Sequence, residues 1–179
     1  MSSPRASVPA LLLIVASLAQ AADIRLDTHR RGDAIEISAS AVIAADPDKA
    51  WAILTDYDRY PGFIPDLTSS RVVERDGSRL VIEQQGEVHF LWIRIPLAVR
   101  MAVVETPIRD VHSILISGTV QELEGHYELE PTALGVRLTY IGRIVPDAAD
   151  RSVLDHFAIR TSVSRQFGAL VGEIEQRGR

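Results

Sequence analysis

Alternating apolar and polar positions dominate the middle of the chain and predict long β-strands. Successive side chains of a strand point to opposite faces, so the alternation separates an inner from an outer face. The positions that share the first predicted inner face are Leu80, Ile82, Gln84, Gly86, Val88, Phe90 and Trp92. Residues 97–105 repeat the pattern with Met101 in the apolar phase, whereas residues 111–118 are too uniformly apolar for their faces to be assigned.

The clearest predicted hairpin has its turn at residues 131–135. A register in which paired residue numbers sum to about 265 places Glu128 opposite Arg137 and Glu122 opposite Arg143. These pairs would lie on the outer face. We therefore interpret the alternating glutamates of this hairpin as a solvated surface rather than as a pair of catalytic carboxylates.

The inner face of the same hairpin contains two glycines. The predicted register sets Gly125 opposite Tyr140 and Leu123 opposite Gly142. A glycine in a strand weakens packing and commonly marks a bend or a close approach. The sequence leaves two alternatives open at this point, strong bending of the sheet or a deliberately empty volume.

A long amphipathic helix is predicted at residues 150–176. Its apolar stripe consists of Val153, Phe157, Ile159, Val163, Phe167, Leu170, Val171 and Ile174. At about 100° per residue, His156, Arg160 and Ser164 form a polar column within this stripe. Because an unpaired buried Arg is costly, either the column lines a wet cavity or this half of the helix overhangs into solvent or holds an internal ion pair.

An aromatic corner lies between the first strand and the meander. Asp46 suits a helix N-cap and Pro47 suits the first helical turn, so a short helix is predicted to begin there. Tyr57, Tyr60 and Phe63 then crowd a segment that two prolines and a glycine bias toward extended and turn conformations. We interpret this segment as a lid over an apolar space.

The order of the predicted elements is a strand, two short helices, a meander of six antiparallel strands and a long C-terminal helix. This order predicts an α+β helix-grip fold, in which a curved antiparallel sheet wraps around the helix and a pocket forms where the two diverge. The sequence YPGFIPD at residues 60–66, with the Ala-Trp pair at residues 50–51, resembles START-like polyketide cyclase/dehydrase and lipid-transport proteins. The resemblance covers residues 35–174 and is closest to the coenzyme Q-binding START-like branch. It implies a cavity wall and a lid, and it carries over no catalytic set.

The N-terminus has the features of an export signal. Arg5 precedes an apolar stretch at residues 8–18, and Ala19 and Ala21 give the small-x-small pattern of a cleavage site. We expect cleavage after Ala21 and a periplasmic or secreted protein; an uncleaved anchor is the alternative. The predicted organisation is therefore a signal peptide at residues 1–21, an extension at residues 22–32 and a START-like domain at residues 33–179. Removing the signal would change the net charge from −5 to −6.

Composition excludes several classes of function. The chain has 179 residues, an acidic balance and scattered basic residues, which argues against nucleic acid as a partner. It contains no cysteine, so thiolate metal sites and a lipid-modified cysteine anchor are excluded. No cluster of His, Asp and Glu has metal-ligand spacing, and no nucleophile elbow or phosphate-binding glycine loop occurs. We expect no metal and no cofactor.

The leading hypothesis is an exported, noncatalytic binding or carrier protein for a hydrophobic molecule such as a lipid, quinone, sterol or polyketide. Affinity would come from buried apolar area, and polar side chains would orient the ligand's oxygen. We expect a monomer, and transient contact with a membrane stays open. The candidate ligand-binding residues are Tyr57, Tyr60, Phe63, Phe90, Trp92, Met101, Tyr127, Tyr140, His156, Phe157 and Arg160.

Two other classes of function stay open. The first is an enzyme of the aromatase/cyclase or dehydratase type that acts on a hydrophobic carbonyl compound. Such chemistry needs a positioned proton donor or acceptor, and the candidates are His156 as a base and Arg160 to polarise an oxyanion. The second is a protein-docking module that uses the lid or an exposed edge strand.

Overall fold

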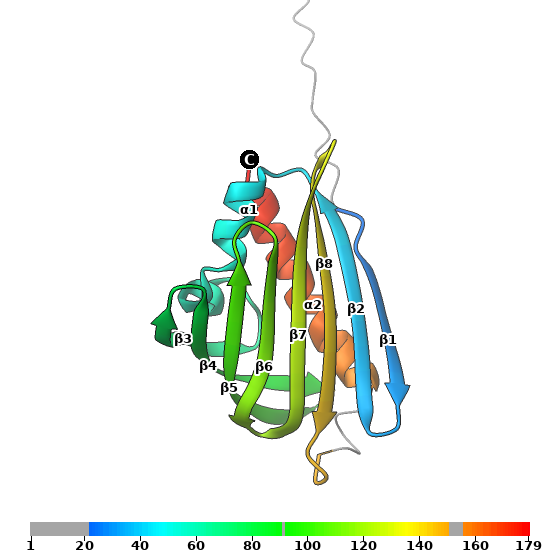
Figure 1. The fold of residues 1–179 in the computed structure, drawn as a ribbon. Coiled ribbons are helices and arrows are strands. Elements are labelled where there is room, and N and C mark those ends of the chain that lie inside the picture. Colours follow the sequence, from blue (N-terminus) through cyan, green and yellow to red (C-terminus); the bar gives the residue numbers. More distant parts are fainter. Residues whose placement is uncertain (1–21, 91, 151–155) are drawn as a thin grey trace, which may run out of the picture.

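Eight antiparallel strands form one curved sheet that packs against a long C-terminal helix (Figure 1). The structure is a computed structural model and describes residues 22–90, 92–150 and 156–179. The strands are β1 (Arg25–Arg31), β2 (Ala34–Ile43), β3 (Leu67–Asp76), β4 (Arg79–Phe90), β5 (Ile93–Thr106), β6 (Asp110–Gly118), β7 (Val120–Thr132) and β8 (Gly135–Pro146). The helices are α1 (Pro47–Leu54), the 3-10 helix η1 (Tyr57–Gly62) and α2 (His156–Arg177). This arrangement confirms the predicted helix-grip fold.

The sheet has the strand order β1-β2-β8-β7-β6-β5-β4-β3. Strands β3 to β8 form the predicted meander. The segment at residues 22–32, which the sequence analysis treated as an extension, contains β1, which pairs with β2 along its whole length. The sheet is therefore one strand wider than predicted.

Helix α1 begins where the sequence predicts. The Asp46 side chain accepts hydrogen bonds from the backbone N–H groups of Asp48 (3.0 Å) and Lys49 (3.1 Å). Pro47 occupies the first turn, where its missing N–H needs no partner. Two of the donors that every helix start leaves unpaired are thus satisfied, which fixes the direction in which the lid leaves β2.

The predicted register of the β7–β8 hairpin is wrong by two residues. Tyr127 lies opposite Tyr140, and Gly125 lies opposite Gly142. The error arises because β7 and β8 stay paired through Thr132 and Gly135, so the connection is shorter than the predicted turn. Gly135 has a φ of 127°, a conformation that glycine adopts most readily, and this lets the hairpin close tightly.

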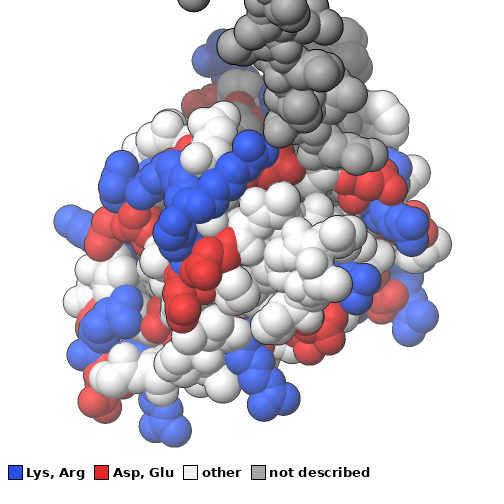
Figure 2. Space-filling model, turned by 90° about the horizontal axis from the view of Figure 1, so that it is seen from above, with Lys and Arg blue, Asp and Glu red and all other residues white. Residues whose placement is uncertain are grey.

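The outer-face charge pairs shift with the register. Arg137 lies opposite Glu130, with Nη1 3.6 Å from Oε2, instead of opposite Glu128. Arg143 lies opposite Glu124, but its Nε reaches diagonally to Oε2 of Glu122 at 3.1 Å. All these side chains are substantially exposed. At the end of the molecule that Figure 2 shows, acidic and basic residues are interspersed rather than gathered by sign.

The two edges of the sheet differ in their surroundings. Strand β1 borders one edge and carries the charged sequence RLDTHRR. Strand β3 borders the other edge, and η1 packs beside it. There the backbone N–H of Val72 donates a hydrogen bond of 2.8 Å to Oδ1 of Asp58. A side chain thus takes the place that a further strand would occupy.

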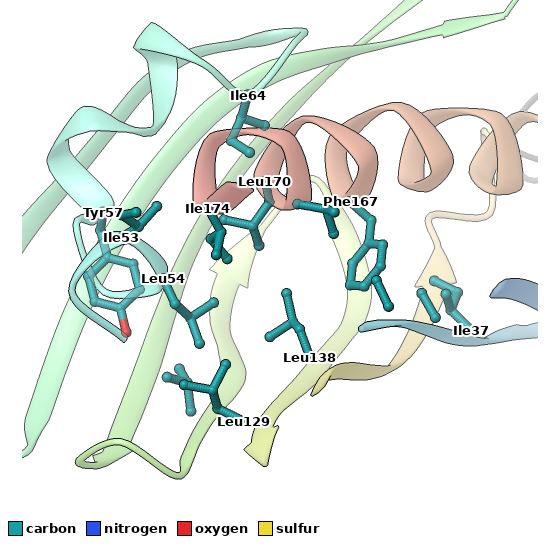
Figure 3. Close-up of a cluster of buried hydrophobic side chains, with 14 of the residues drawn as sticks. Ile37, Ile53, Leu54, Tyr57, Ile64, Leu129, Leu138, Phe167, Leu170 and Ile174 are labelled. Atoms are coloured by element: carbon teal, nitrogen blue, oxygen red, sulfur yellow. The ribbon is translucent and has the colours of Figure 1, made fainter. Parts of the chain in front are cut away.

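The hydrophobic core lies between the concave face of the sheet and α2 (Figure 3). From the helix, Phe167, Leu170 and Ile174 point toward the strands, where Leu138 and Ile37 face them. Among the described residues, no helix has the length and apolar character that a membrane crossing requires.

Candidate functional site

A cavity of about 220 Å³ lies between the concave face of the sheet, the lid and α2. On this measure one water molecule needs roughly 10–15 Å³, so the space is a real hollow and not a packing defect. Its lining is contributed by the lid, by strands β2 to β8 and by α2. The lining consists of Ile37, Leu54, Tyr57, Tyr60, Ile64, Leu67, Ile82, Gln84, Gln85, Gly86, Val88, Leu97, Val99, Met101, Val103, Val111, Ser113, Leu123, Gly125, Tyr127, Tyr140, Ile144, Ile159, Ser162, Val163, Gln166 and Leu170.

The lid is a packed aromatic unit. The Tyr60 hydroxyl donates a 2.5 Å hydrogen bond to the backbone oxygen of Leu54 and so joins η1 to the end of α1. The Tyr60 ring meets the rings of Tyr57 and Phe63 edge-on, with centroids 5.7 and 5.5 Å away. This geometry is favourable for aromatic pairs. Tyr57 and Tyr60 line the cavity, whereas Phe63 packs behind them.

Two tyrosines and two glycines form the opposite wall. The rings of Tyr127 and Tyr140 lie 4.6 Å apart as directly opposed residues of β7 and β8. A Cβ atom on Gly142 would lie 2.5 Å from the Tyr140 hydroxyl oxygen, and one on Gly125 would lie 3.3 Å from the same ring. The paired glycines therefore make room for the Tyr140 ring to lie flat along the wall. The sequence had left sheet bending or empty volume as explanations of the two glycines. Neither is sufficient by itself, because the Tyr140 ring occupies the space beside them.

The cavity contains hydrogen-bonding groups but lacks charge. None of its described lining residues is Asp, Glu, Lys, Arg or His. Its polar side chains are tyrosines, serines and glutamines, and some already have partners: Gln84 donates to Ser70 at 3.1 Å, and Ser113 donates to the backbone oxygen of Gly125 at 3.1 Å. Within the described chain, the hydroxyls of Tyr127 and Tyr140 make no hydrogen bond. They are thus the groups that a bound oxygen can meet.

Burial keeps these phenols protonated. It raises the pKa of Tyr140 to about 12. It also raises the pKa of Tyr127 well above its usual value, and the neighbouring Tyr140 adds to this effect. Near neutral pH both side chains are therefore neutral hydrogen-bond donors, and neither can act as a general base.

A polar pair lies buried behind the lid. The hydroxyl of Tyr57 and Oε1 of Glu105 are both inaccessible and make no hydrogen bond in the described part of the chain. The other oxygen of Glu105 lies 3.4 Å from Nη1 of Arg75. Burial, and then the negative charge of Glu105, raise the pKa of Tyr57. An unsatisfied buried hydroxyl is costly, so Tyr57 stabilises the lid less than its size suggests.

A charged cluster joins the end of the lid to β4 and α2. Asp66 has a φ of 64°, and its carboxylate forms an ion pair with Arg165 of α2. Its Oδ1 also lies 3.4 Å from Nδ1 of His89, whose Nε2 lies 2.8 Å from Oε2 of Glu87. The sequence analysis missed this cluster because its members lie far apart in the chain. The signal that could have found it is the acidic residue that ends the YPGFIPD motif.

Five of the predicted ligand-binding residues line the cavity: Tyr57, Tyr60, Met101, Tyr127 and Tyr140. The side chain of Phe90 lies outside the described residues. Trp92 does not line the cavity, because 85% of its surface is exposed. The alternation that placed it inside ends at Phe90, and Trp92 belongs to the turn before β5.

The predicted residues at the start of α2 also lie outside the cavity lining. Phe157 is 55% exposed, and His156 and Arg160 are exposed as well. Nη1 of Arg160 lies 3.9 Å from Oδ1 of Asp27 on β1. The polar column thus faces β1 and solvent, and the helix turns Ile159 and Ser162 toward the cavity instead.

None of the described histidines of the sheet lines the cavity. His112 and His126 lie opposite each other on β6 and β7, with ring centroids 5.9 Å apart, and alternate outward with the glutamates. Nε2 of His112 lies 2.9 Å from Oε1 of Glu124. In the described part of the chain, no three or more His, Cys, Asp or Glu side chains are arranged to hold a metal ion.

The family model for polyketide cyclase/dehydrase and lipid transport matches residues 43–177, which span the lid, the meander and α2. The chain belongs to this family. No curated protein matches it. The match includes every lining residue except Ile37 and leaves out β1 and almost all of β2.

Several solved structures share the fold at low sequence identity. The STAR-related lipid transfer protein of Xanthomonas axonopodis is 14% identical, with a TM-score of 0.66 over 86% of this chain and 94% of its own. The Zhui aromatase/cyclase from a Streptomyces species is 18% identical, with a TM-score of 0.61 over 88% and 97%. A START superfamily protein of Mycobacterium smegmatis is 15% identical, with a TM-score of 0.61 over 80% and 96%. These likenesses establish the helix-grip architecture.

Proposed function

We propose that the protein is a noncatalytic carrier of a neutral hydrophobic molecule and that it works in the periplasm or outside the cell. One observation carries the proposal: the cavity is apolar, and its described lining holds no Asp, Glu, Lys, Arg or His. A buried charge without a partner is costly, so a ligand that enters this space should be uncharged. Its apolar body would supply the affinity, as it does in most small-molecule sites.

The hydroxyls of Tyr127 and Tyr140 give the ligand a polar end. Both are protonated donors without a partner in the described chain. A ligand with a carbonyl or hydroxyl oxygen satisfies them, whereas a pure hydrocarbon leaves them unpaired. Neutral quinones, sterols and polyketide-like ketones all meet this requirement. A fatty acid in its ionised form does not.

The carrier is favoured over the aromatase/cyclase alternative by the position of the candidate catalytic groups. His156 and Arg160, which that chemistry would need, are exposed on the side of α2 that faces β1. A general base must come within hydrogen-bond reach of the proton that it removes. The cavity itself offers phenols and amides, which bind and orient a carbonyl without taking up a proton.

A matched pair of ligands tests the proposal. Displacement of Nile red from the purified protein would be measured with dodecanol and with dodecanoate, which differ in charge and share a chain length. At neutral pH we expect dodecanol to bind roughly tenfold or more tightly than dodecanoate. Dodecanol affinity should stay constant from about pH 6 to 9 because the lining phenols do not titrate there. Equal or tighter binding of dodecanoate would refute a cavity for neutral ligands.

Matched variants locate the binding site. Val163→Trp fills the cavity wall on α2, whereas Leu134→Trp adds the same bulk at a residue that is 76% exposed in the β7–β8 turn. We expect the first to abolish Nile red binding and the second to leave it unchanged. Conversion of a bound ketone by the wild type, lost in Tyr140→Phe, would establish the enzyme instead.

A further inference from the structure

The first described residue of the chain lies against the last turns of α2. The backbone nitrogen of Ala22 donates a hydrogen bond of 3.1 Å to Oε1 of Glu175, and the contact is partly buried. Ala22 also packs against the hydrophobic core. This contact joins residues that are almost a whole domain apart in the chain.

Glu175 is a carboxylate that has no cationic partner among the described residues. In the part of the chain that the structure describes, Ala22 is its one hydrogen-bond or ion-pair partner. The nearest acidic residue on the same helix, Glu173, is already paired with Arg177 at 2.8 Å. A negative charge near a helix C-terminus interacts unfavourably with the helix dipole, so a positively charged partner at Glu175 would be stabilising.

The position of Ala22 is fixed by packing along the helix. The segment that follows it runs antiparallel to α2: Ile24 lies beside Gly168, with its Cδ1 3.8 Å from the place of a Cβ there. Further on, Asp27 lies 3.9 Å from Arg160. The pairing of β1 with β2 holds the same segment from its other side. These contacts on both sides hold the segment along the helix and place Ala22 beside Glu175.

We propose that Glu175 is the binding site for the α-ammonium group that cleavage after Ala21 creates on Ala22. Hydrolysis of the Ala21–Ala22 peptide bond takes up one water, leaves a carboxylate on Ala21 and frees an amine on Ala22, which is protonated at neutral pH. A neutral amide with one donor becomes a cation with three donors at the same place. Processing then converts a single hydrogen bond into an ion pair and fastens the C-terminal end of α2. This inference rests on the export that the proposed function includes, and not on the ligand.

Urea unfolding of two chains, each with Glu175 and with Glu175→Gln, tests the proposal. One chain begins at Ala22 after proteolytic removal of a tag, and the other carries a Gly-Ser extension before Ala22. In the first chain we expect the substitution to lower the folded-to-unfolded ratio about fivefold, which is about 1 kcal/mol. In the extended chain the change should be less than about twofold. An equal effect in both chains would overturn the proposal.

A control variant and a second measurement distinguish the proposed ion pair from a general effect of removing a carboxylate from α2. Glu173→Gln removes a neighbouring carboxylate that does not contact Ala22, so we expect the same effect in both chains. Acetylation of the Ala22 amino group should reproduce the loss in the chain that begins there, without any substitution in the helix. The intact mass of the exported protein must correspond to a start at Ala22, and cleavage at another bond would refute the proposal. Because none of these measurements uses a ligand, they separate this inference from the carrier function.

Discussion

The two halves of α2 differ in how closely they pack against the rest of the protein. Residues 167–177 form the packed half: Phe167 and Val171 are 2% exposed and Ile174 is fully buried. Residues 156–166 form the hollow half, where Val163 lines the cavity and Phe157 is mainly exposed. One helix thus provides mainly core side chains at one end and mainly cavity wall at the other, and Leu170 and Ile159 belong to both. Stability and binding can therefore be altered separately.

The difference follows from what each half packs against. The packed half ends at the turn that precedes α1, where the backbone N–H of Asp46 donates to the oxygen of Gly178 at 2.7 Å. A Cβ on Gly178 would lie 2.9 Å from the Cβ of Ala45, so the two segments are in close contact. The hollow half faces the part of the sheet where the walls stand apart. Packing is complete where the end of α2 meets the turn before α1, and it is incomplete where the cavity separates α2 from the sheet and the lid.

The largest difference between the halves should appear on truncating one buried side chain in each. Phe167→Ala creates a cavity in a fully packed place, and we expect it to lower the free energy of unfolding by about 3–5 kcal/mol. Val163→Ala enlarges an existing cavity at a partly exposed place and should cost less than about 1 kcal/mol. Urea unfolding measures both. Similar losses for the two variants would contradict the division.

A smaller effect is expected from adding one methyl group to the cavity wall. Gly142→Ala places a Cβ 2.5 Å from the Tyr140 hydroxyl, so the ring must move away from the wall. We expect a loss of about 1–3 kcal/mol in stability together with weaker Nile red binding. Gly125→Ala is the milder control, because its Cβ would come no closer than 3.0 Å to any atom. Unchanged binding in Gly142→Ala would mean that Tyr140 does not shape the ligand site.

The lid tyrosines allow a finer comparison. Tyr60→Phe removes a hydroxyl that is bonded to Leu54 and should cost about 1–2 kcal/mol. Tyr57→Phe removes a buried hydroxyl that has no hydrogen bond in the described chain, so stability should change by less than about 0.5 kcal/mol or rise. Thermal or urea unfolding of both variants checks the ranking. A reversed order would show that Tyr57 and Glu105 are bonded in solution.

The smallest effect is expected at the exposed face of the hollow half. Arg160→Ala breaks an ion pair with Asp27 in which both side chains are about half exposed or more. We expect a loss below about 0.5 kcal/mol and unchanged Nile red affinity. A clear loss of binding without a loss of stability would restore Arg160 to the ligand site.

Local rules explain which parts of the fold could be predicted from sequence. The N-cap at Asp46, the meander and the long helix each depend on residues close together in the chain. The β1 strand could not be predicted, because its charged sequence RLDTHRR lacks a clear alternation. It is held by pairing with β2 and by packing on α2. The register error had a readable signal, since Gly135 marks the true end of the hairpin turn.

The same distinction applies to the candidate site. The lid and the inner tyrosines were predicted because alternation and composition place them. The surroundings of the polar column of α2 could not be predicted, because helical periodicity shows which residues share a face but not which element that face packs against. The unpredicted strand β1 supplies Asp27, and this decides the direction of Arg160. Ser113 was missed because its strand has no usable apolar-polar contrast.

The sheet is open and has two edge strands, β1 and β3, which are protected against pairing with another chain in different ways. Unpaired backbone groups at a flank can recruit a strand from another copy and start polymerisation. On the β3 flank, Asp58 occupies the N–H of Val72 and η1 stands in the way. On the β1 flank, three arginines outnumber the single acidic residue Asp27, so edge-to-edge pairing with a second copy would bring positive charges together. Both flanks therefore disfavour pairing of the sheet edges between copies, whether or not the cavity is filled.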